Sequence, residues 1–387
     1  MNKKQVSCGI VTEYYNNYNY GGNLQAFALQ KYVMDNLMQC EQIQFDYEYK
    51  PNLSKWILKF KSIKRKEKFK LVTNSIKSRT SKYIHPFSIS LIKKRNSVIS
   101  SFTKTIPHSK DIFTLSSINT ADSLYDFFIC GSDCIWDISN NPFYSALGFV
   151  NDGKKKIAYA ASAGCMYLPN GWSEKFLPYV KHLDAISVRE KTIASELQSL
   201  LPDKKISTVV DPTLLFTRQE WDRFISPLDS ISGFSLIYLL SENRSQAKSA
   251  LTYSKKNGVK SLTFPNIQGF VHTWQRKYGE VQNYSADPFQ FIELIRDSEV
   301  VITDSFHAVV FCVIYHKSFF ALKRETHQEY VGRVENFLED IGLSSQMITE
   351  EELNNINTIP KIDFSYADKV IEEKRRISID FLKENLR

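Results

Sequence analysis

The stretch Val300–Ile314, VVITDSFHAVVFCVI, places one imidazole and one carboxylate between two apolar runs. The first run, Val300–Thr303, is short and rich in β-branched residues, which is typical of a buried parallel strand, and the second, Ala308–Tyr315, can continue as a helix packed against the sheet. In open α/β sheets, ligands bind at the carboxyl end of a strand and the first turn of the next helix. The pattern therefore makes His307 the leading candidate for a functional residue, and a structural histidine beside an Asp N-cap is the alternative.

Strand-like and helix-like segments alternate along the whole chain. This order predicts an α/β fold of two Rossmann-like, doubly wound domains that face each other across a cleft. The expected strands are Gln5–Thr12, Gln42–Tyr47, Phe127–Cys130, Lys156–Ala161, Ala185–Val188, Thr208–Val210, Phe234–Leu240, Val259–Phe264, Val300–Thr303 and Ser318–Leu322. The expected helices are Gly22–Met38, Glu190–Leu201, Ser245–Asn257, Pro288–Ser298, Tyr330–Ile341 and Asp363–Leu386.

The length of 387 residues exceeds that of one ordinary core and fits two domains of about 150 to 200 residues each. We expect an N-terminal domain over residues 1–215 with a basic helical insertion at 50–110, a C-terminal domain over 216–365, and a final helix over 366–387. The sequence shows neither a long apolar window nor a secretory cleavage pattern, so we expect a cytoplasmic protein without a transmembrane helix. The six cysteines lack paired zinc spacings, so we expect reduced thiols and no metal site.

Positive charge is concentrated in one segment. Between Lys50 and Lys110 there are 17 Lys or Arg residues and the single acid Glu67, a net charge of +16, whereas the rest of the chain sums to −8. The part Lys55–Lys82 interleaves these charges with aromatic and aliphatic residues, as in a basic amphipathic helix or helix pair. An anionic inner leaflet or lipid-linked substrate is the favoured partner, a solvated helical insertion is the second interpretation, and nucleic acid is disfavoured because no stacking module is recognisable.

Six separated segments stand in one order and cover most of the chain outside this insertion. They are Asn19-Tyr20-Gly21-Gly22-Asn23-Leu24-Gln25 before Ala28-Leu29-Gln30, Gly131-Ser132-Asp133 with Trp136, Lys156-Ile157-Ala158-Tyr159-Ala160-Ala161-Ser162, Ser187-Val188-Arg189-Glu190, Val210-Asp211-Pro212-Thr213, and Asp304-Ser305-Phe306-His307. Together they resemble the polysaccharide pyruvyl transferase family.

The resemblance implies a fold similar to that of B-type glycosyltransferases and transfer of a pyruvyl group from phosphoenolpyruvate to two sugar hydroxyls as a ketal. It also implies capsule, exopolysaccharide or cell-wall glycan synthesis on a lipid-linked or polymeric acceptor at the inner membrane face. Such an acceptor would give the basic insertion a purpose, with the enzyme cytoplasmic or peripheral at that face. The resemblance implies no cofactor.

The chemistry of such a transfer asks for an acid and for fixed cations. Ketal formation begins with protonation of the methylene carbon, which suits a histidine, and His307 resembles the family's active-site histidine, so we assign it the role of general acid. The donor carries a carboxylate and a phosphate, which arginine binds well. Arg189 is the first candidate for this task and Arg333 the second, followed by Lys323 and Arg324; the alternative for each is a surface ion pair.

The motif around His307 departs from the family at one position. Many members carry Arg two residues before the active-site histidine, and here Ser305 occupies that position, next to Phe306. We count Ser305 and Phe306 in the donor site, but the missing cation leaves another anionic donor open unless Arg324 or Arg333 reaches across. A nucleotide-sugar glycosyltransferase of the same architecture and a non-catalytic membrane-associated scaffold are the other two hypotheses.

Two loops of the N-terminal domain are expected to bind the acceptor. Asn19, Tyr20, Gly21, Gly22 and Asn23 are interpreted as a strand-to-helix loop whose glycines permit φ > 0 and close backbone approach, with a plain tight turn as the alternative. We expect His307 to face this turn across the cleft. In the second loop, Gly131, Ser132 and Asp133, the carboxylate is expected to bind the acceptor and help remove its proton, or else to cap a helix.

Overall fold

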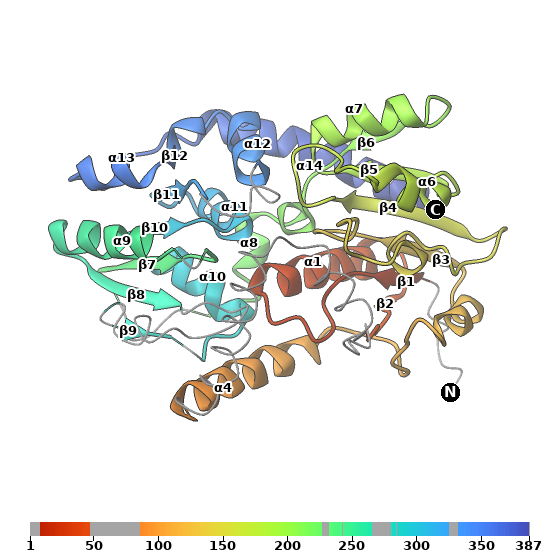
Figure 1. Ribbon diagram of the computed structural model, residues 1–387, viewed down its shortest axis with the longest axis horizontal. Helices are drawn as coiled ribbons and strands as arrows, with labels where there is room; N and C mark the ends of the chain where they lie inside the picture. Colours follow the sequence, from red (N-terminus) through yellow and green to blue (C-terminus); the bar gives the residue numbers. More distant parts are fainter. Residues whose placement is uncertain are drawn as a thin grey trace, which may run out of the picture.

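The computed structural model describes residues 8–46, 86–226, 232–241, 243–264, 279, 281–283, 285–324 and 332–386. Two six-stranded parallel sheets, each covered by helices, form two lobes (Figure 1). The expected α/β class with two Rossmann-like lobes is therefore confirmed. The segment Lys55–Lys82, on which the expectation of a basic amphipathic helix rests, lies outside the described residues.

The first sheet has the strand order β2-β1-β3-β4-β5-β6. The chain passes from β1 to β2 on one side and then to β3 on the other side of β1, so the switch point lies between β1 and β3. The strands are β1 (Cys8–Val11), β2 (Cys40–Gln42), β3 (Phe127–Cys130), β4 (Lys155–Ala161), β5 (Ala185–Val188) and β6 (Ile206–Thr208). The accompanying helices are α1 (Tyr20–Asn36), α4 (Pro86–Thr103), η1 (Ile118–Leu124), α5 (Pro142–Ser145), α6 (Trp172–Val180) and α7 (Lys191–Leu200).

The second sheet has the order β12-β11-β10-β7-β8-β9, with its switch point between β7 and β10. Its strands are β7 (Phe234–Tyr238), β8 (Lys260–Phe264), β9 (Val281–Gln282), β10 (Val300–Thr303), β11 (Phe319–Leu322) and β12 (Met347–Ile348). The helices are α9 (Arg244–Lys256), α10 (Pro288–Asp297), α11 (Phe306–Ile314), α12 (Arg333–Asp340), η5 (Ser344–Gln346) and α13 (Glu350–Asn355). The short elements η2 (Pro212–Leu215) and α8 (Arg218–Trp221) connect the lobes, and α14 (Ser365–Asn385) ends the fold.

Local sequence explains the elements that carry the functional residues. All four residues of β10 are buried, and α11 is apolar around most of its circumference, so both can exist only inside a covered sheet. Ser305 begins α11 as its N-cap, and its side chain accepts a hydrogen bond from the Ala308 N–H. This cap fixes the start of α11 just after β10, and His307 is thereby placed in the first turn of the helix.

One continuous apolar core joins the two lobes. Tyr20, the first residue of α1, stacks on Phe291 of α10 with ring centroids 4.8 Å apart, and its hydroxyl donates to the Ala286 carbonyl at 3.1 Å. About two helical turns further along α1, Phe27 packs edge-on against Phe289 with centroids 5.1 Å apart. The lobes are therefore held together by aromatic packing as well as by the chain connections.

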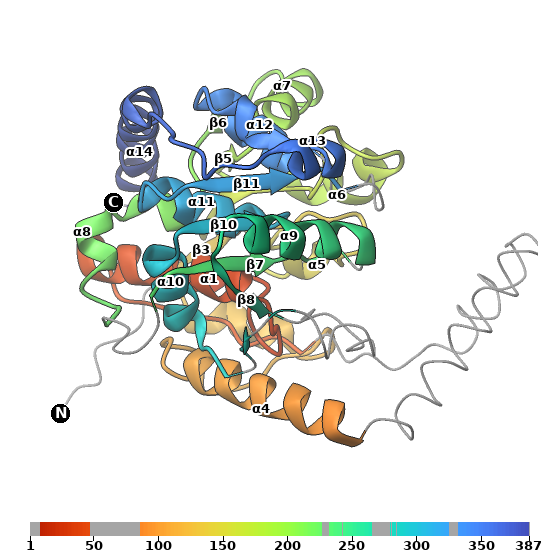
Figure 2. The ribbon, with the colours of Figure 1, turned by 90° about the vertical axis from the view of Figure 1, so that its left-hand side faces the viewer.

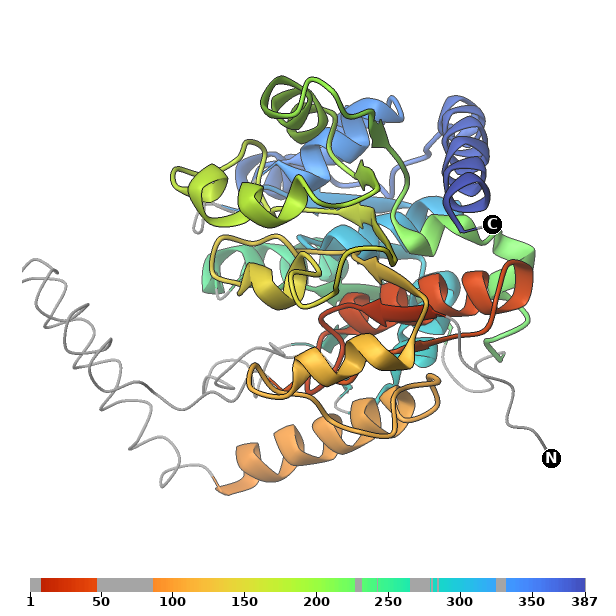
Figure 3. The same cartoon turned by 90° about the vertical axis from the view of Figure 1, so that its right-hand side faces the viewer.

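The last helix, α14, returns to the first lobe, on the opposite side of the molecule from α4 (Figures 2 and 3). The Ser378 hydroxyl accepts a hydrogen bond from the Val210 N–H at 2.9 Å, and Arg375 Nε donates to the Leu214 carbonyl at 2.7 Å. Two hydrogen bonds from α14 thus fix the segment that leaves β6. No helix among the residues described is long and apolar enough to cross a lipid bilayer.

Several boundaries differ from those expected. The strands Phe127–Cys130, Ala185–Val188 and Val300–Thr303 are confirmed to the residue. The strand expected at Gln42–Tyr47 is wrong, because pairing with β1 covers Cys40–Gln42 and only isolated bridges follow. The helix α6 was not expected, since Pro178 inside it interrupts the helical pattern.

Candidate active site

Charged residues from both lobes meet where the carboxyl ends of the strands face each other. Asp133 follows β3, Arg189 and Glu190 follow β5, and Asp211 follows β6 in the first lobe. From the second lobe, His307 lies in the first turn of α11 and Arg333 in the first turn of α12. We call these six residues the charged cluster: Asp133, Arg189, Glu190, Asp211, His307 and Arg333.

Arg189 lies at the centre of the charged cluster. Its Nη1 donates to Asp211 Oδ2 at 2.7 Å, and its Nη2 lies 3.6 Å from Asp133 Oδ1. The guanidinium also stacks over the Phe306 ring of the other lobe, 4.8 Å from the ring centroid. Burial alone would lower the pKa of Arg189, but the neighbouring carboxylates of Glu190, Asp211 and Asp133 raise it, so the guanidinium stays charged. The arginine is therefore a fixed interior cation that faces the second lobe.

The His307 imidazole lies between Asp211 and the first turn of α1. Its Nε2 is fully buried, makes no hydrogen bond, and lies 3.5 Å from Asp211 Oδ2. A Cβ added at Gly21 would lie only 2.1 Å from His307 Nδ1, so no larger residue than glycine fits there without a shift. The side chain is 7% exposed, which makes it buried but not completely enclosed. The structure thus brings the imidazole and the glycine turn together.

Of the two reasons expected for glycine in this turn, only close approach applies. Residues 20–23 form the first turn of α1 rather than a loop, with Asn19 as the N-cap that accepts a hydrogen bond from the Gly21 N–H. Neither Gly21 nor Gly22 has a positive φ. Close approach of His307, and not backbone conformation, is what excludes a side chain at Gly21.

The two aspartates of the charged cluster remain ionised. Burial would raise the pKa of Asp211, but the facing His307 and Arg189 hold it well below its usual range. The pKa of Asp133 is lowered in the same way by His307, Arg189 and Arg333, against the effect of burial. Both carboxylates are therefore counterions of the cationic side chains around them.

Arg333 supplies a cation from the second lobe. Its Nη1 lies 3.1 Å from Asp133 Oδ1 and 3.0 Å from Cys134 Sγ, so the side chain crosses from one lobe to the other. Arg333 thus brings a guanidinium from the start of α12 into contact with the first lobe.

Arg324 and Lys323 are placed differently. Arg324 Nε lies 3.1 Å from Asp304 Oδ2, and its Nη2 donates to the Asp304 carbonyl at 3.0 Å. Asp304 in turn accepts hydrogen bonds from the backbone N–H groups of Leu240 and Ser241. The guanidinium is therefore engaged within its own lobe, and Lys323 is exposed and contributes its carbonyl to Gln246.

Most residues expected to bind the acceptor make interior contacts. Tyr20 is inserted into the aromatic contact between the lobes, and Asn23 binds the Asn17 and Asn19 carbonyls and accepts from Thr103. The Ser132 hydroxyl donates to the Ala160 carbonyl at 2.8 Å. A side chain at Gly131 would meet the Tyr159 carbonyl at 2.1 Å. The polar groups of Tyr20, Asn23 and Ser132 are therefore engaged with the protein itself.

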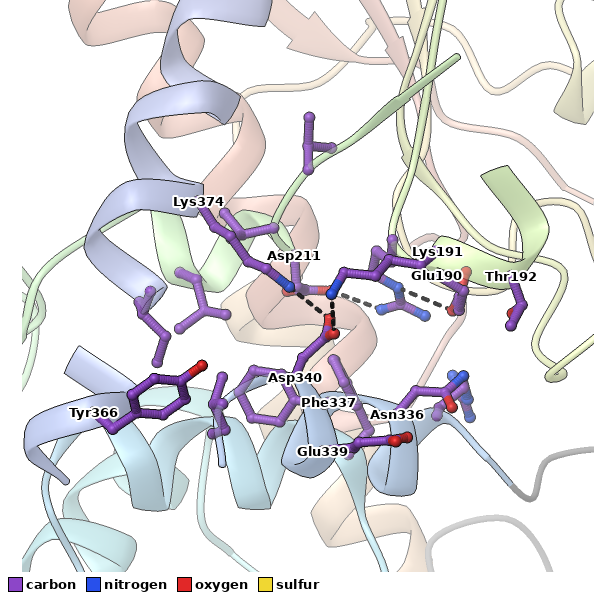
Figure 4. Close-up of a pocket in the computed structure, with 18 residues that line it drawn as sticks. Glu190, Lys191, Thr192, Asp211, Asn336, Phe337, Glu339, Asp340, Tyr366 and Lys374 are labelled. Carbon is purple, nitrogen blue, oxygen red and sulfur yellow. Dashed lines mark hydrogen bonds and ion pairs between the residues drawn. The ribbon is translucent and has the colours of Figure 1, made fainter. Parts of the chain in front are cut away.

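A cavity of about 450 Å³ adjoins the charged cluster (Figure 4). Its lining residues come from both lobes and from α14: Arg189, Glu190, Lys191, Thr192, Val209, Val210, Asp211, Leu214, Phe306, Arg333, Asn336, Phe337, Glu339, Asp340, Ile341, Tyr366, Ile371 and Lys374. Asp340 bridges the lobes, with Lys191 Nζ at 2.5 Å from one carboxylate oxygen and Lys374 Nζ at 2.5 Å from the other. His307 does not line the cavity, but its Nε2 lies 3.5 Å from Asp211, which does.

Sequence reasoning had not selected Asp211, Glu190 or Asp340 for this site. A signal existed for the first two, since both belong to the six separated segments singled out in the sequence. No local pattern marks Asp340, which lies at the end of a surface helix and reaches the site only through the arrangement of the lobes.

Two parallel-sheet lobes facing each other across a polar cleft define a two-domain α/β enzyme fold of the B-type glycosyltransferase kind. UDP-GlcNAc 2-epimerase of Methanocaldococcus jannaschii is similar to the chain with a TM-score of 0.51 and 9% identity, covering 95% of this chain and 99% of the epimerase. A putative UDP-N-acetylglucosamine 2-epimerase of Listeria monocytogenes gives a TM-score of 0.50 and 12% identity, with 97% of each chain covered. At such identities the likeness extends to the fold alone.

The family model of polysaccharide pyruvyl transferase matches residues 19–326. The chain therefore belongs to the polysaccharide pyruvyl transferase family and is a transferase of polysaccharide biosynthesis. None of the curated proteins compared with the chain matches its sequence.

Proposed function

We propose that the protein transfers a pyruvyl group from phosphoenolpyruvate to two hydroxyls of a glycan, forming a ketal. The observation that carries this proposal is the charged cluster, in which an imidazole of one lobe lies beside a buried carboxylate and an arginine of the other. Phosphoenolpyruvate carries a carboxylate and a phosphate, and Arg189 and Arg333 are two guanidinium groups in the same cleft, each able to bind such groups through two N–H donors.

In the proposed mechanism, His307 gives a proton to the methylene carbon of the donor, and the neighbouring carbon becomes open to attack by a hydroxyl. Asp211 Oδ2, 3.5 Å from Nε2, stabilises the protonated ring and fixes its orientation. Gly21 confines the ring on its other edge. Asp211 thus acts as the counterion of the His307 ring, and Gly21 limits its position sterically.

Asp133 has a different role in this proposal from the one expected from sequence. Its pKa is held low by His307, Arg189 and Arg333, although burial acts in the opposite direction, which makes it a weak base. It binds Arg333 at 3.1 Å and lies 3.6 Å from Arg189. We assign Asp133 to the positioning of the two donor-binding cations.

The adjoining cavity is the proposed site of the acceptor glycan. Its volume of about 450 Å³ lies in the range of ligand pockets, roughly 300 to 1,000 Å³. We further propose that the acceptor is lipid-linked or polymeric and that the +16 segment meets the anionic inner leaflet, since clustered Lys and Arg are attracted to such surfaces.

The test is release of inorganic phosphate from phosphoenolpyruvate in the presence of a pyruvylation acceptor. His307→Ala is expected to lower the rate by roughly 100-fold or more, because it removes the acid. His316→Ala is the matched control: His316 lies on the surface, 47% exposed, and pairs with Asp368. Unchanged release in His307→Ala would eliminate His307 as the acid. Thermal stabilisation by a nucleotide sugar, but not by phosphoenolpyruvate, would favour a glycosyltransferase.

A further inference from the structure

Glu190 is a buried carboxylate that the mechanism described so far leaves without a role. Its Oε1 accepts a hydrogen bond from the Ser162 hydroxyl at 2.6 Å and lies 3.7 Å from Arg189 Nε. Its Oε2 is fully buried and has no hydrogen-bond partner, and the residue is only 4% exposed. Leaving a buried polar atom without a partner costs free energy, so an unbonded carboxylate oxygen beside a cavity calls for a functional explanation.

The position of Glu190 suits contact with a ligand. It lines the cavity together with Arg189, Asp211 and Arg333, and Figure 4 shows its carboxylate between Lys191 and Thr192 at the start of α7. Ser162 fixes one oxygen, so the orientation of the side chain is set before any ligand arrives. The other oxygen has no hydrogen-bond partner in the protein, and it belongs to a residue that lines the cavity.

Glu190 also differs chemically from the two aspartates of the charged cluster. Asp133 and Asp211 each make a short contact with an arginine, and their pKa values are lowered despite burial. For Glu190 burial is the largest effect and raises the pKa, although Arg189 and the Ser162 hydroxyl oppose it. A carboxylate with a raised pKa accepts a proton more readily than its lowered neighbours.

We propose that Glu190 is a second catalytic residue, whose Oε2 accepts the proton of an acceptor hydroxyl as that hydroxyl attacks the donor carbon. The inference rests on the proposed pyruvyl transfer. Ketal formation forms two C–O bonds from two hydroxyls, breaks the C–O bond to phosphate and forms one C–H bond at the methylene carbon. The two hydroxyl protons balance the proton that His307 gives to carbon and the one that leaves on inorganic phosphate. Glu190 carries one of them between hydroxyl and phosphate.

The experiment compares Glu190→Gln with the wild-type protein. Glutamine keeps the shape of the side chain and can still accept from Ser162, but it cannot take up the proton, so ketal formation is expected to fall at least 100-fold. Thermal stabilisation by phosphoenolpyruvate is expected to persist, because Arg189 and Arg333 are intact. Glu196→Gln is the matched control on the same helix; its carboxylate accepts from the Leu168 N–H at 2.7 Å, away from the cavity lining.

A pH profile separates catalysis from a structural role. The carboxylate must be ionised to accept a proton, so the wild-type rate is expected to rise with pH through the raised pKa of Glu190, and this limb is expected to vanish in Glu190→Gln. A near-normal rate, or an acid limb that survives in Glu190→Gln, would overturn the assignment of Glu190 alone. A wild-type protein that neither binds phosphoenolpyruvate nor forms a ketal would overturn the proposed function and this inference with it.

Discussion

Two of the contacts between the lobes differ in chemistry, since one is aromatic and the other is charged. Around Tyr20 the contact is aromatic: this ring stacks on Phe291, and its hydroxyl is hydrogen-bonded to the Ala286 carbonyl. In the charged cluster, by contrast, Arg189 Nε and Nη2, Glu190 Oε2 and His307 Nε2 are buried without hydrogen bonds. The aromatic contact also buries one unbonded hydroxyl, that of Tyr238.

We interpret the aromatic contact as the one that stabilises the fold and the charged cluster as the one that serves function. Aromatic packing holds the lobes at a fixed distance, which allows the charged cluster to keep polar atoms in an arrangement that is costly for the protein alone. Buried groups with incomplete hydrogen bonding and shifted pKa values are typical of sites that bind or transform a ligand. The comparison predicts that substitutions in the aromatic contact change stability and those in the charged cluster change chemistry.

The largest effect on stability is expected for Phe291→Ala. The change removes the ring on which Tyr20 stacks from a fully buried position, and such truncations cost about 3 to 5 kcal/mol. Urea unfolding followed by fluorescence measures the loss. Turnover per folded molecule is expected to stay near the wild-type value, so a variant that folds fully but loses turnover would break the proposed division between the two contacts.

A smaller effect, which depends on pH, is expected for Asp211→Asn. The folded-state pKa of Asp211 is lowered, so the ionised form stabilises the fold above the unfolded-state value of about 4, and this contribution is lost as the pH falls below it. At pH 7 the variant is expected to be about 2 to 3 kcal/mol less stable than the wild type, because a hydrogen-bonded charge is removed. The gap should narrow towards pH 3 in denaturant titrations; a constant gap would contradict the pairing with His307 and Arg189.

The smallest effect is expected for Gly21→Ala, which introduces a methyl group beside the imidazole. Overpacking of this kind costs about 1 to 3 kcal/mol. The cost should disappear when Gly21→Ala is combined with His307→Ala, since the second change removes the clashing ring. Unfolding free energies of the two single variants and the double variant give the coupling, and purely additive values would show that Gly21 does not support the ring.

The fold could be predicted from sequence largely because its strands are short, apolar and buried. β10 and α11 are the best examples, since the run Val300–Ile314 has few polar residues and only one arrangement buries it on both sides. The edge strand β2 was misplaced because an edge is specified less strongly than the centre of a sheet.

The positions of His307 and Arg189 were predictable because each lies just after a short buried strand, whereas their roles in a reaction stay predictions. The site was not predictable where two distant segments have to meet. The contact of Arg333 with Asp133 joins residues 200 positions apart, and the approach of Gly21 to His307 depends on the docking of one lobe on the other. The amide and hydroxyl groups of Asn23 and Ser132 were assigned to a ligand, although they satisfy backbone groups of the protein itself.

The helix α4 is anchored to both lobes. Phe102, near the end of α4, packs edge-on against Phe289 of the second lobe with centroids 4.8 Å apart, and Thr103 donates to Asn23 of α1 at 2.8 Å. The axis of α4 is therefore fixed relative to both lobes. A surface that binds α4 would therefore be held in one orientation relative to the cleft.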